Sequence, residues 1–209
     1  MSPPDDNVAL DAAALVLASC RTGVISFGEH VREVKFVLDN EDGRIVCPVM
    51  VAALEEPELV LFVPEESDQA LQLLLDPEEV DEKDHSRAID RWIAHHGDPV
   101  DLHWIACWID AARLGTFVID GVALMNANPL AGAESRVCRR FNENKDDLRA
   151  VCSRFGGMDI EDPVCVGVGP LGLSVKSRFD IVFVPFGDPA HNESALDAEI
   201  GRLISRAKA

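Results

Sequence analysis

The residues of this sequence that could bind an anion lie between positions 32 and 72. Three basic residues occur in a Val- and Ile-rich region, and Ser67 stands at the start of a short apolar segment. Ser is a preferred N-cap residue, so we expect a helix over residues 67–75, ended by the following Asp-Pro dipeptide. The exposed N–H groups and the positive end of a helix bind phosphate. The side chains of this region that are able to contact an anion are Arg32, Lys35, Arg44, Ser67, Gln69 and Gln72.

A second interpretation of the same segment needs no ligand. Ser67 would then only cap the expected helix, because Ser is common at that position in any helix. Gln69 and Gln72 would be ordinary surface positions. Both interpretations stay open at this point.

Six histidines are candidates for metal ligation. His95 and His96 are adjacent, so on a helix they point to different faces, and no H-x-x-x-H spacing accompanies them. A site built from His85, His103 and Asp101 is the one arrangement left open. The sequence predicts no metal site.

Residues 167–172 read Gly-Val-Gly-Pro-Leu-Gly and match the dinucleotide-binding pattern G-x-G-x-x-G letter for letter. That pattern binds pyrophosphate between a strand and a helix, whereas a β-prone segment follows here. Pro170 suits a turn. We therefore predict a hairpin connection rather than a nucleotide site.

No residue is assigned a catalytic role. The nucleophile pattern G-x-S-x-G is absent, and none of the six cysteines has a sequence context typical of catalysis. Each cysteine occurs singly in an apolar or helical stretch, which is typical of reduced, buried thiols. Trp92, Trp104 and Trp108 are expected to pack in the core, with one of them facing a planar ligand ring as the alternative.

Composition indicates a substantial core and argues against two classes of partner. The 209 residues, 47% of them hydrophobic, are enough for two small domains. Asp and Glu outnumber Lys and Arg by 37 to 19, and the formal net charge of -18 repels a phosphate backbone, so we expect no nucleic-acid binding. No signal-peptide pattern and no run of about 20 apolar residues occurs, so we expect a cytoplasmic protein without membrane contact.

Hydrophobic patterning predicts an antiparallel β-domain over residues 11–131. The first ten residues are polar and Pro-rich and should form a disordered arm, followed by a helix over 11–20. Further helices are expected over 67–75 and 85–95. Val- and Ile-rich runs predict the strands of a meander, and a later hairpin should turn near residues 112–115. The strand runs are 23–27, 31–39, 43–54 and 59–64.

A Pro/Gly loop over residues 128–132 marks a boundary, after which a second domain is expected over 132–209. An amphipathic helix over 134–155 should be followed by three strands and a last helix capped by Ser194. The apolar stripe of the long helix consists of Val137, Phe141, Leu148, Val151, Cys152 and Phe155. The predicted fold class is α+β, an antiparallel barrel followed by a small α-β-β-β-α domain.

The segments DGRIVCPVMVAAL, LVLFVP and SDQALQLLLDPEEV follow one another in an order that resembles flavin-reductase-like, pyridoxamine-phosphate-oxidase-like split β-barrels. The helix of that superfamily reads S-x-K-x-x-N-L-x-x-N-P-x-V, and Ser67, Leu73 and Pro77 match it. The resemblance implies an FMN phosphate near the start of this helix. Gln69 and Gln72 replace a basic residue and an Asn, so neutral donors take the place of a charge-assisted contact. The basic residues that could substitute are Arg32, Lys35 and Arg44.

The C-terminal third resembles the small domain behind the split barrel of haem-utilisation proteins, a domain that also occurs in glutamyl-tRNA reductase-binding proteins. Its opening pattern is H-x-N-x-D-H-x-D-x-L, in which Asn142 and Asp147 have counterparts. Arg140 and Lys145 replace the two histidines. Neither side chain ligates iron readily, so haem is a less expected ligand than FMN.

The resemblances imply two functions. The first is a flavin- or haem-linked oxidoreductase, a homodimer that binds a flavin or a tetrapyrrole at the subunit interface. The second is a cofactor-free adaptor or regulatory binding protein of the same fold. Gln69, Arg140 and Lys145 depart from the ligand pattern and favour the second function.

Overall fold

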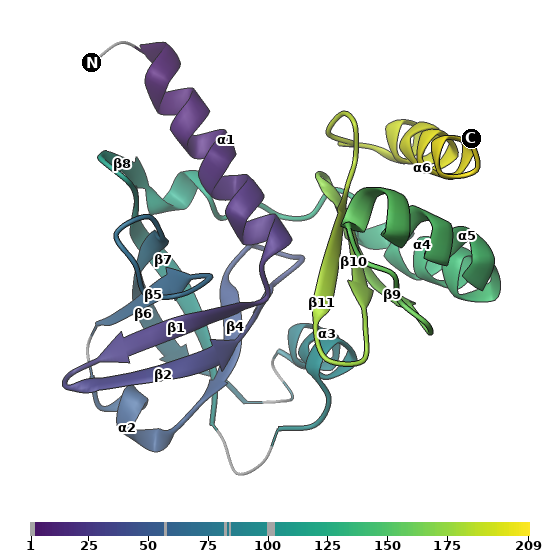
Figure 1. The fold of residues 1–209 in the computed structure, drawn as a ribbon. Coiled ribbons are helices and arrows are strands. Elements are labelled where there is room, and N and C mark those ends of the chain that lie inside the picture. Colours follow the sequence, from purple (N-terminus) through teal and green to yellow (C-terminus); the bar gives the residue numbers. More distant parts are fainter. Residues whose placement is uncertain (1–2, 57, 82, 84, 100–102) are drawn as a thin grey trace. The chain divides into compact units, whose positions relative to one another are not determined.

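The chain folds into two compact units, Met1–Ala127 and Asn128–Ala209, which we call the barrel unit and the C-terminal unit (Figure 1). The computed structural model describes residues 3–56, 58–81, 83, 85–99 and 103–209. The division falls after Ala127, whereas the sequence predicts it after residue 131. None of the described helices has the length and apolar character that a membrane crossing requires.

A strongly curled antiparallel sheet forms the barrel unit, and it confirms the predicted α+β class with a split-barrel architecture. Its strand order is β2-β1-β5-β6-β7-β4-β3, with β8 paired to β7. The strands are β1 (Thr22–Phe27), β2 (His30–Lys35), β3 (Val37–Leu38), β4 (Ile45–Val49), β5 (Leu59–Val63), β6 (Leu71–Glu79), β7 (His103–Leu114) and β8 (Phe117–Asp120). The helices are α1 (Pro3–Ser19), α2 (Val51–Leu54), α3 (Ser86–His96) and the 3-10 turn η1 (Gly121–Ala123).

The concave face of this sheet carries the main core. Side chains alternate along β1, β5 and β6 between buried and half-buried, the period of two that a one-sided strand requires. Helix α1 packs Ala9, Ala13 and Leu17, spaced four residues apart, into this core. Residues 3–10 therefore belong to a helix, and the disordered arm expected there is wrong for them.

Helix α3 covers part of the opposite face of the sheet. Its Ala88, Ile89 and Trp92 pack against Trp104 and Ala106 of β7 in a second, smaller core. Trp92 donates a hydrogen bond from Nε1 to the carbonyl oxygen of Lys35 at 2.8 Å. The helix expected over 85–95 is thus confirmed, and it ends at Gly97, whose φ of 87° favours glycine.

The helix expected over 67–75 is wrong. Leu71, Leu73 and Leu75 are buried on one face of a strand that pairs with β5 and β7. Short Leu-rich runs satisfy a helical and a strand period about equally, and here the neighbouring strands decide. The short helix of this region is α2, within a run expected to be strand.

The strands are not the expected meander. Strand β4 pairs with β7, and β1 pairs with β5, so pairing skips neighbours in the sequence. The hairpin of β7 and β8 is confirmed, with Gly115 at its turn in a left-handed conformation. A strongly curled sheet with this strand order requires such long-range pairs, which local patterning does not encode.

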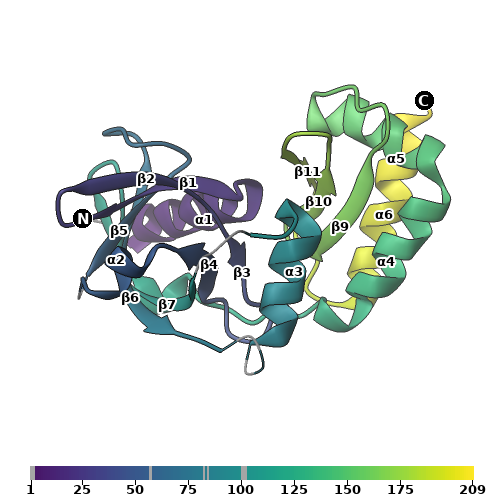
Figure 2. The same ribbon diagram turned by 90° about the horizontal axis from the view of Figure 1, so that it is seen from below.

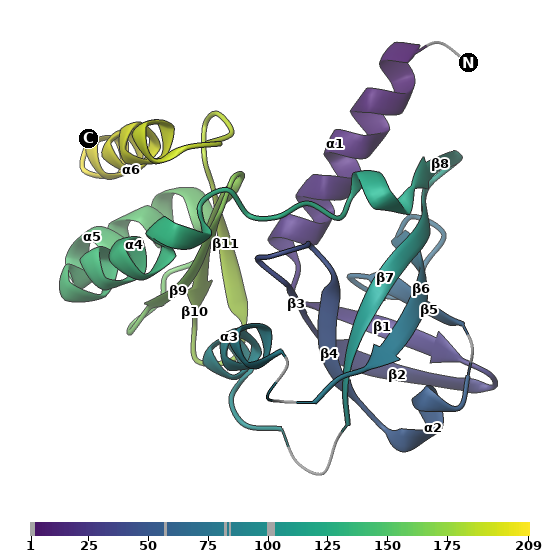
Figure 3. The same ribbon diagram turned by 180° about the vertical axis from the view of Figure 1, so that it is seen from behind.

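The C-terminal unit has its helices on one face of a three-stranded sheet of order β11-β10-β9, as Figures 2 and 3 show. Its elements are α4 (Ala131–Glu143), α5 (Lys145–Val151), the π-helical turn η2 (Cys152–Gly156), β9 (Val164–Gly169), β10 (Gly172–Lys176), β11 (Ile181–Pro185) and α6 (Glu193–Ala207). The predicted apolar stripe lies in the core between helices and sheet. The predicted hairpin at residues 169–172 is confirmed.

Two details of this unit differ from the sequence prediction. The long helix is interrupted at Asn144, whose ψ of 65° is not helical, and continues as α5. The last helix begins two residues earlier than expected, because Asn192 rather than Ser194 accepts the capping hydrogen bond, from the N–H of Ala195 at 2.9 Å.

Candidate functional site

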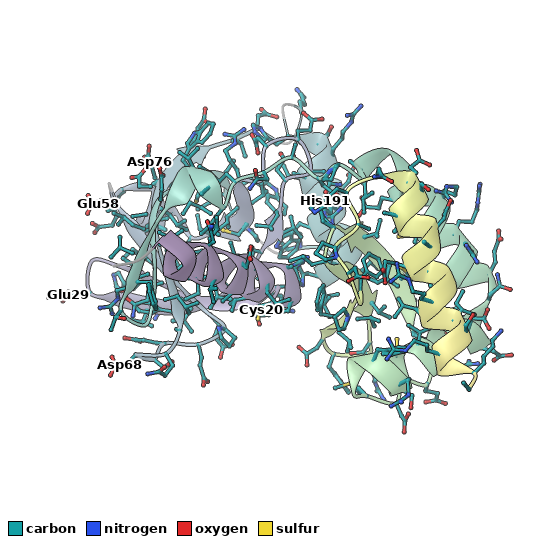
Figure 4. All side chains as sticks on the ribbon, turned by 90° about the horizontal axis from the view of Figure 1, so that it is seen from above. Cys20, Glu29, Glu58, Asp68, Asp76 and His191 are labelled. Atoms are coloured by element: carbon teal, nitrogen blue, oxygen red, sulfur yellow. The ribbon has the colours of Figure 1, made fainter. Side chains whose placement is uncertain are left out.

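The helix start on which the expected phosphate site at Ser67 depends is not present in the structure. Ser67 lies in the bend between β5 and β6, where the N–H of Ala70 donates to its carbonyl oxygen at 3.2 Å. The adjacent Asp68 projects from this connection at the periphery of the barrel unit (Figure 4). Since no helix begins here, the segment does not present the first-turn N–H groups and the dipole end of a helix to a phosphate.

The other predicted ligands of the phosphate are dispersed. Arg32 lies opposite the inward-facing Ile25, and Lys35 lies opposite Thr22, so the two basic side chains are on different faces of β2. Gln72 accepts a hydrogen bond from Arg113 at 2.9 Å. Of the six candidates, Arg44 alone occupies an organised polar site.

Arg44 is the centre of that site. Its Nε donates to Asp42 at 2.7 Å, its Nη1 to Glu78 at 2.9 Å and its Nη2 to Nε2 of His85 at 2.8 Å. The guanidinium also lies over the ring of Trp108, 4.9 Å from the centroid. Its side chain is only 11% exposed, so these contacts hold a largely buried cation.

Four segments of the chain build the Arg44 site. Arg44 follows a tight turn in which the N–H of Gly43 donates to the carbonyl oxygen of Asp39 at 3.0 Å. Gly43 has a φ of 81°, and a Cβ there would collide with the backbone of Asn126. Glu78 comes from β6 and Trp108 from β7, and His85 immediately precedes α3. The pairing of β6 with β7 and the docking of α3 therefore position the partners of Arg44.

The hydrogen bond from Arg44 fixes the tautomer of His85. A guanidinium only donates, so Nε2 of His85 is the acceptor and the ring proton of the neutral form is on Nδ1. Nδ1 is buried and has no hydrogen-bond partner among the residues that the structure describes. His85 can therefore donate one hydrogen bond from Nδ1 in this state.

A small polar hollow of about 190 Å³ adjoins Arg44 and the start of α3. Three carboxyl groups line it, against two guanidinium groups, so negative charge is in excess before a ligand arrives. Such a hollow disfavours a phosphate dianion. Its lining residues are Asp39, Glu41, Asp42, Arg44, His85, Ser86, Arg87 and Ala88.

The metal arrangement left open by the sequence finds no support in the part of the chain that the structure describes. His85 bonds to Arg44, and Nδ1 of His103 lies 3.0 Å from a carboxyl oxygen of Glu79. No group of three or more His, Cys, Asp or Glu side chains suited to a metal occurs among the described residues. Asp101 lies outside those residues.

Of the tryptophans, two are core residues and the third belongs to the Arg44 site. Trp92 and Trp104 are buried and meet edge to face, with ring centroids 5.3 Å apart. Trp108 is 45% exposed and carries Arg44 on its ring. The alternative of a tryptophan that faces a planar ligand therefore concerns Trp108.

The haem-related positions of the C-terminal unit take part in contacts within that unit. Nζ of Lys145 donates to Asp162 at 2.7 Å and to the carbonyl oxygen of Pro163 at 2.8 Å. Asp147 pairs with Lys208 at 2.7 Å. Asn142 exchanges two hydrogen bonds with the backbone of Cys165. The arrangement of Asn142 and Lys145 thus joins α4 and α5 to the start of β9.

His95, which the sequence analysis considers only as a metal-ligand candidate, is a buried polar residue of α3. It is 2% exposed, and its Nδ1 donates to the carbonyl oxygen of Arg91 at 2.7 Å. Burial, followed by the nearby charge of Arg91, lowers the pKa of His95 from 6.5 to about 3. Its spacing from Ala88 and Trp92 places it on the buried face of α3, so helical periodicity is the signal that could have found it.

Comparison with known proteins identifies the fold. No protein-family model and no curated protein matches the sequence. A solved protein of unknown function from Agrobacterium tumefaciens superposes with a TM-score of 0.73 at 14% identity, covering 98% of this chain and 97% of its own. At this identity, the likeness shows the fold alone.

Two further solved structures have lower similarity. A heme binding protein from Mycobacterium smegmatis has a TM-score of 0.45 at 18% identity, covering 96% of this chain and 97% of its own. A candidate pyridoxamine 5'-phosphate oxidase from Listeria innocua has a TM-score of 0.40 at 18% identity, covering 51% and 97%. These scores add nothing on the function of this chain.

Proposed function

We propose that this chain is a split-barrel binding protein that acts as an adaptor or regulator without a flavin phosphate site. The arrangement of Arg44 carries the proposal. Its guanidinium is held by Asp42, Glu78 and His85, and a flavin phosphate would have to compete with two carboxylates for it. The residues that the flavin resemblance implies do not fit the group.

The one short helix between β4 and β5 supports the same proposal. Helix α2 has the sequence Val-Ala-Ala-Leu, and its N-cap Met50 provides no side-chain hydrogen bond. With four residues and no polar side chain, α2 offers little to an anion. Helix α2 itself therefore supplies no replacement for the phosphate ligands expected at Ser67.

A homodimer is part of the proposal, with its interface on the convex face of the barrel sheet. Strand register places Val24 beside Phe62 and Val60 beside Leu74, and these apolar side chains are half-buried and belong to neither barrel core. Val118 on β8 is 75% exposed. An apolar sheet face of this kind suits a self-complementary interface between two copies.

The cofactor question is tested by the visible absorption spectrum of the purified protein and by titration with FMN and with haemin. We expect no flavin or Soret band that persists through gel filtration, and no saturable quenching of tryptophan fluorescence by FMN. A stoichiometric yellow complex would contradict the proposal. Replacing Arg44 by Gln would then show whether the complex depends on the site described above.

The interface is tested by sedimentation of Phe62→Glu and Leu74→Glu variants, because a charge at either position would be buried between two copies. Val8→Glu is the matched control, since Val8 is 68% exposed on α1. We expect a dimer for the parent and the control, and a monomer for the two interface variants. A monomeric parent at micromolar concentration would refute this part of the proposal.

One observation favours the second candidate, a flavin- or haem-linked oxidoreductase. Trp108 is half-exposed beside Arg44 on the convex face, where a planar ring can stack on an aromatic side chain. If a ligand binds there, Trp108→Ala should abolish fluorescence quenching and weaken its binding. The loss should exceed that of Val118→Ala, an exposed position on β8 of the same sheet that is remote from Trp108 in the strand register.

A further inference from the structure

Two thiols meet in the C-terminal unit where α4 crosses β9. Sγ of Cys165 lies 3.8 Å from Sγ of Cys138 and donates its proton toward it. Cys138 is half-buried, whereas Cys165 is 2% exposed. A half-buried cysteine is thus in contact, sulfur to sulfur, with one that is sealed in the core.

Asn142 fixes the backbone of Cys165 relative to the helix that carries Cys138. It lies one turn after Cys138 on α4, and its amide accepts from the N–H of Cys165 at 2.8 Å and donates to the carbonyl oxygen of Cys165 at 2.9 Å. Strand β9 is an edge of its sheet, so the side chain of Asn142 satisfies backbone groups at this edge. The backbone of Cys165 is therefore fixed to the helix that carries Cys138.

We propose that Cys138 and Cys165 are a reversible oxidation site that a peroxide converts to a disulfide. The thiolate of Cys138 attacks one oxygen of the peroxide, the O–O bond breaks, and Cys138 becomes a sulfenic acid. The sulfur of Cys165 then attacks the sulfenic sulfur, the S–S bond forms and water leaves. The two thiols together lose two electrons and two protons, and a hydroperoxide is reduced to water and an alcohol or to two waters. A dithiol reductant reverses the step.

Burial and hydrogen bonding indicate which cysteine reacts with the peroxide and which one then forms the disulfide with it. The hydrogen bond to Cys138 and burial raise the pKa of Cys165 well above its ordinary value of 9.0. Cys165 therefore stays protonated and inaccessible to a peroxide in solution. Cys138 is the less buried of the two residues, so it is the one that a peroxide in solution meets.

The other four cysteines are the comparison against which the reactivity of Cys138 and Cys165 is judged. Cys47, Cys107 and Cys152 are buried, and burial raises the pKa of Cys47 to about 12 and that of Cys152 to about 11. Cys20 follows α1 in the barrel unit (Figure 4) and is half-buried like Cys138. The contact of its sulfur is with the hydroxyl of Ser19 at 3.8 Å rather than with a thiol.

The experiment treats the full chain with hydrogen peroxide, blocks free thiols with an alkylating reagent and maps disulfides by mass spectrometry. We expect a Cys138–Cys165 crosslink with the loss of two hydrogen atoms, reversed by dithiothreitol, while Cys20 remains alkylated. In Cys165→Ser, a dimedone adduct should replace the crosslink at Cys138. In Asn142→Ala, crosslinking should slow by roughly tenfold, because Cys165 is no longer held in place.

Three outcomes would overturn the proposal. The first is oxidation of Cys138 no faster than that of Cys20. The second is accumulation of sulfinic and sulfonic acid at Cys138 in the parent chain without a crosslink. The third is formation of the crosslink only after denaturation. Far-ultraviolet circular dichroism of each variant before treatment separates a loss of reactivity from a loss of folding.

Discussion

Replacing Arg44 by Met tests whether the Arg44 site is a structural centre of the barrel unit. The variant keeps much of the apolar stem but removes the donors to Asp42, Glu78 and His85. It leaves Asp42, whose side chain is 33% exposed, without its cation. We expect the free energy of unfolding of the barrel unit to fall.

The magnitude follows from the exposure of each partner. The charge-assisted hydrogen bond to Asp42 contributes about 1.5 kcal/mol, because Arg44 is largely buried. Stacking on Trp108 adds about 0.5 kcal/mol. The pair with Glu78 adds close to nothing, because Glu78 is 60% exposed. The hydrogen bond to His85 adds about 0.5–1.5 kcal/mol, so the expected loss is about 2.5–3.5 kcal/mol.

The assay is urea denaturation followed by tryptophan fluorescence. Trp92, Trp104 and Trp108 all belong to the barrel unit, so the signal reports on that unit alone. Arg87→Met is the matched control, because Arg87 lines the same hollow but is 88% exposed and pairs with Glu41 only in solvent. If the two variants lose the same stability to within about 0.5 kcal/mol, Arg44 is not the centre we describe.

Three further predictions concern single residues. Gly43→Ala should destabilise the barrel unit by about 1–3 kcal/mol in the same assay, because φ at this position is positive and a Cβ would meet the backbone of Asn126. An unchanged midpoint of urea denaturation would show that the turn adapts. Asn142→Leu should lower the stability of the C-terminal unit by about 2 kcal/mol, because two backbone groups of Cys165 lose their hydrogen-bond partner. Circular dichroism measures this loss, and an unchanged stability would mean that water replaces the amide. His95 has a folded pKa below that of the unfolded chain, so its contribution is present above pH 6.5 and is lost as the pH falls toward 3. Stability should drop by about 2 kcal/mol between about pH 7.5 and pH 5 and less in His95→Asn, and equal slopes would refute this assignment.

The sequence predicted those parts of the fold that depend on local patterns. The helix that begins after His85 and the hairpin over 169–172 have strong periodic or turn signals, and both are confirmed. The segment over 71–79 has no such local signal, because its leucines satisfy two periods. Its pairing with β5 and β7 decides its structure, and that information lies elsewhere in the chain.

The candidate site was predictable in its residues but not in its assembly. The sequence offers Arg44 as a phosphate ligand, whereas His85 as a metal ligand and Trp108 as a stacking platform are only the alternatives to the predictions of no metal site and of core packing. The structure brings these three together in one site with a different arrangement. Contact between residues 44 and 85 depends on the docking of α3 against the sheet, which no pattern near either residue encodes.

Side chains with several donors or acceptors can bind a ligand, and they can equally connect distant segments of the fold. The charges around such a side chain indicate which of these two roles it has. Arg44 and Asn142 both present several donors or acceptors in fixed geometry, which is why each is typical of a binding site. In this chain, Arg44 joins segments 34 and 41 residues apart, and Asn142 joins two that are 23 residues apart. A phosphate arriving at Arg44 would replace carboxylates that already neutralise the cation, so it would gain little charge stabilisation and would lose its own hydration. We therefore expect the barrel unit to bind its partner, a second copy of the chain, through the apolar convex face rather than through Arg44. Phe62 and Leu74 are only half-buried on that face.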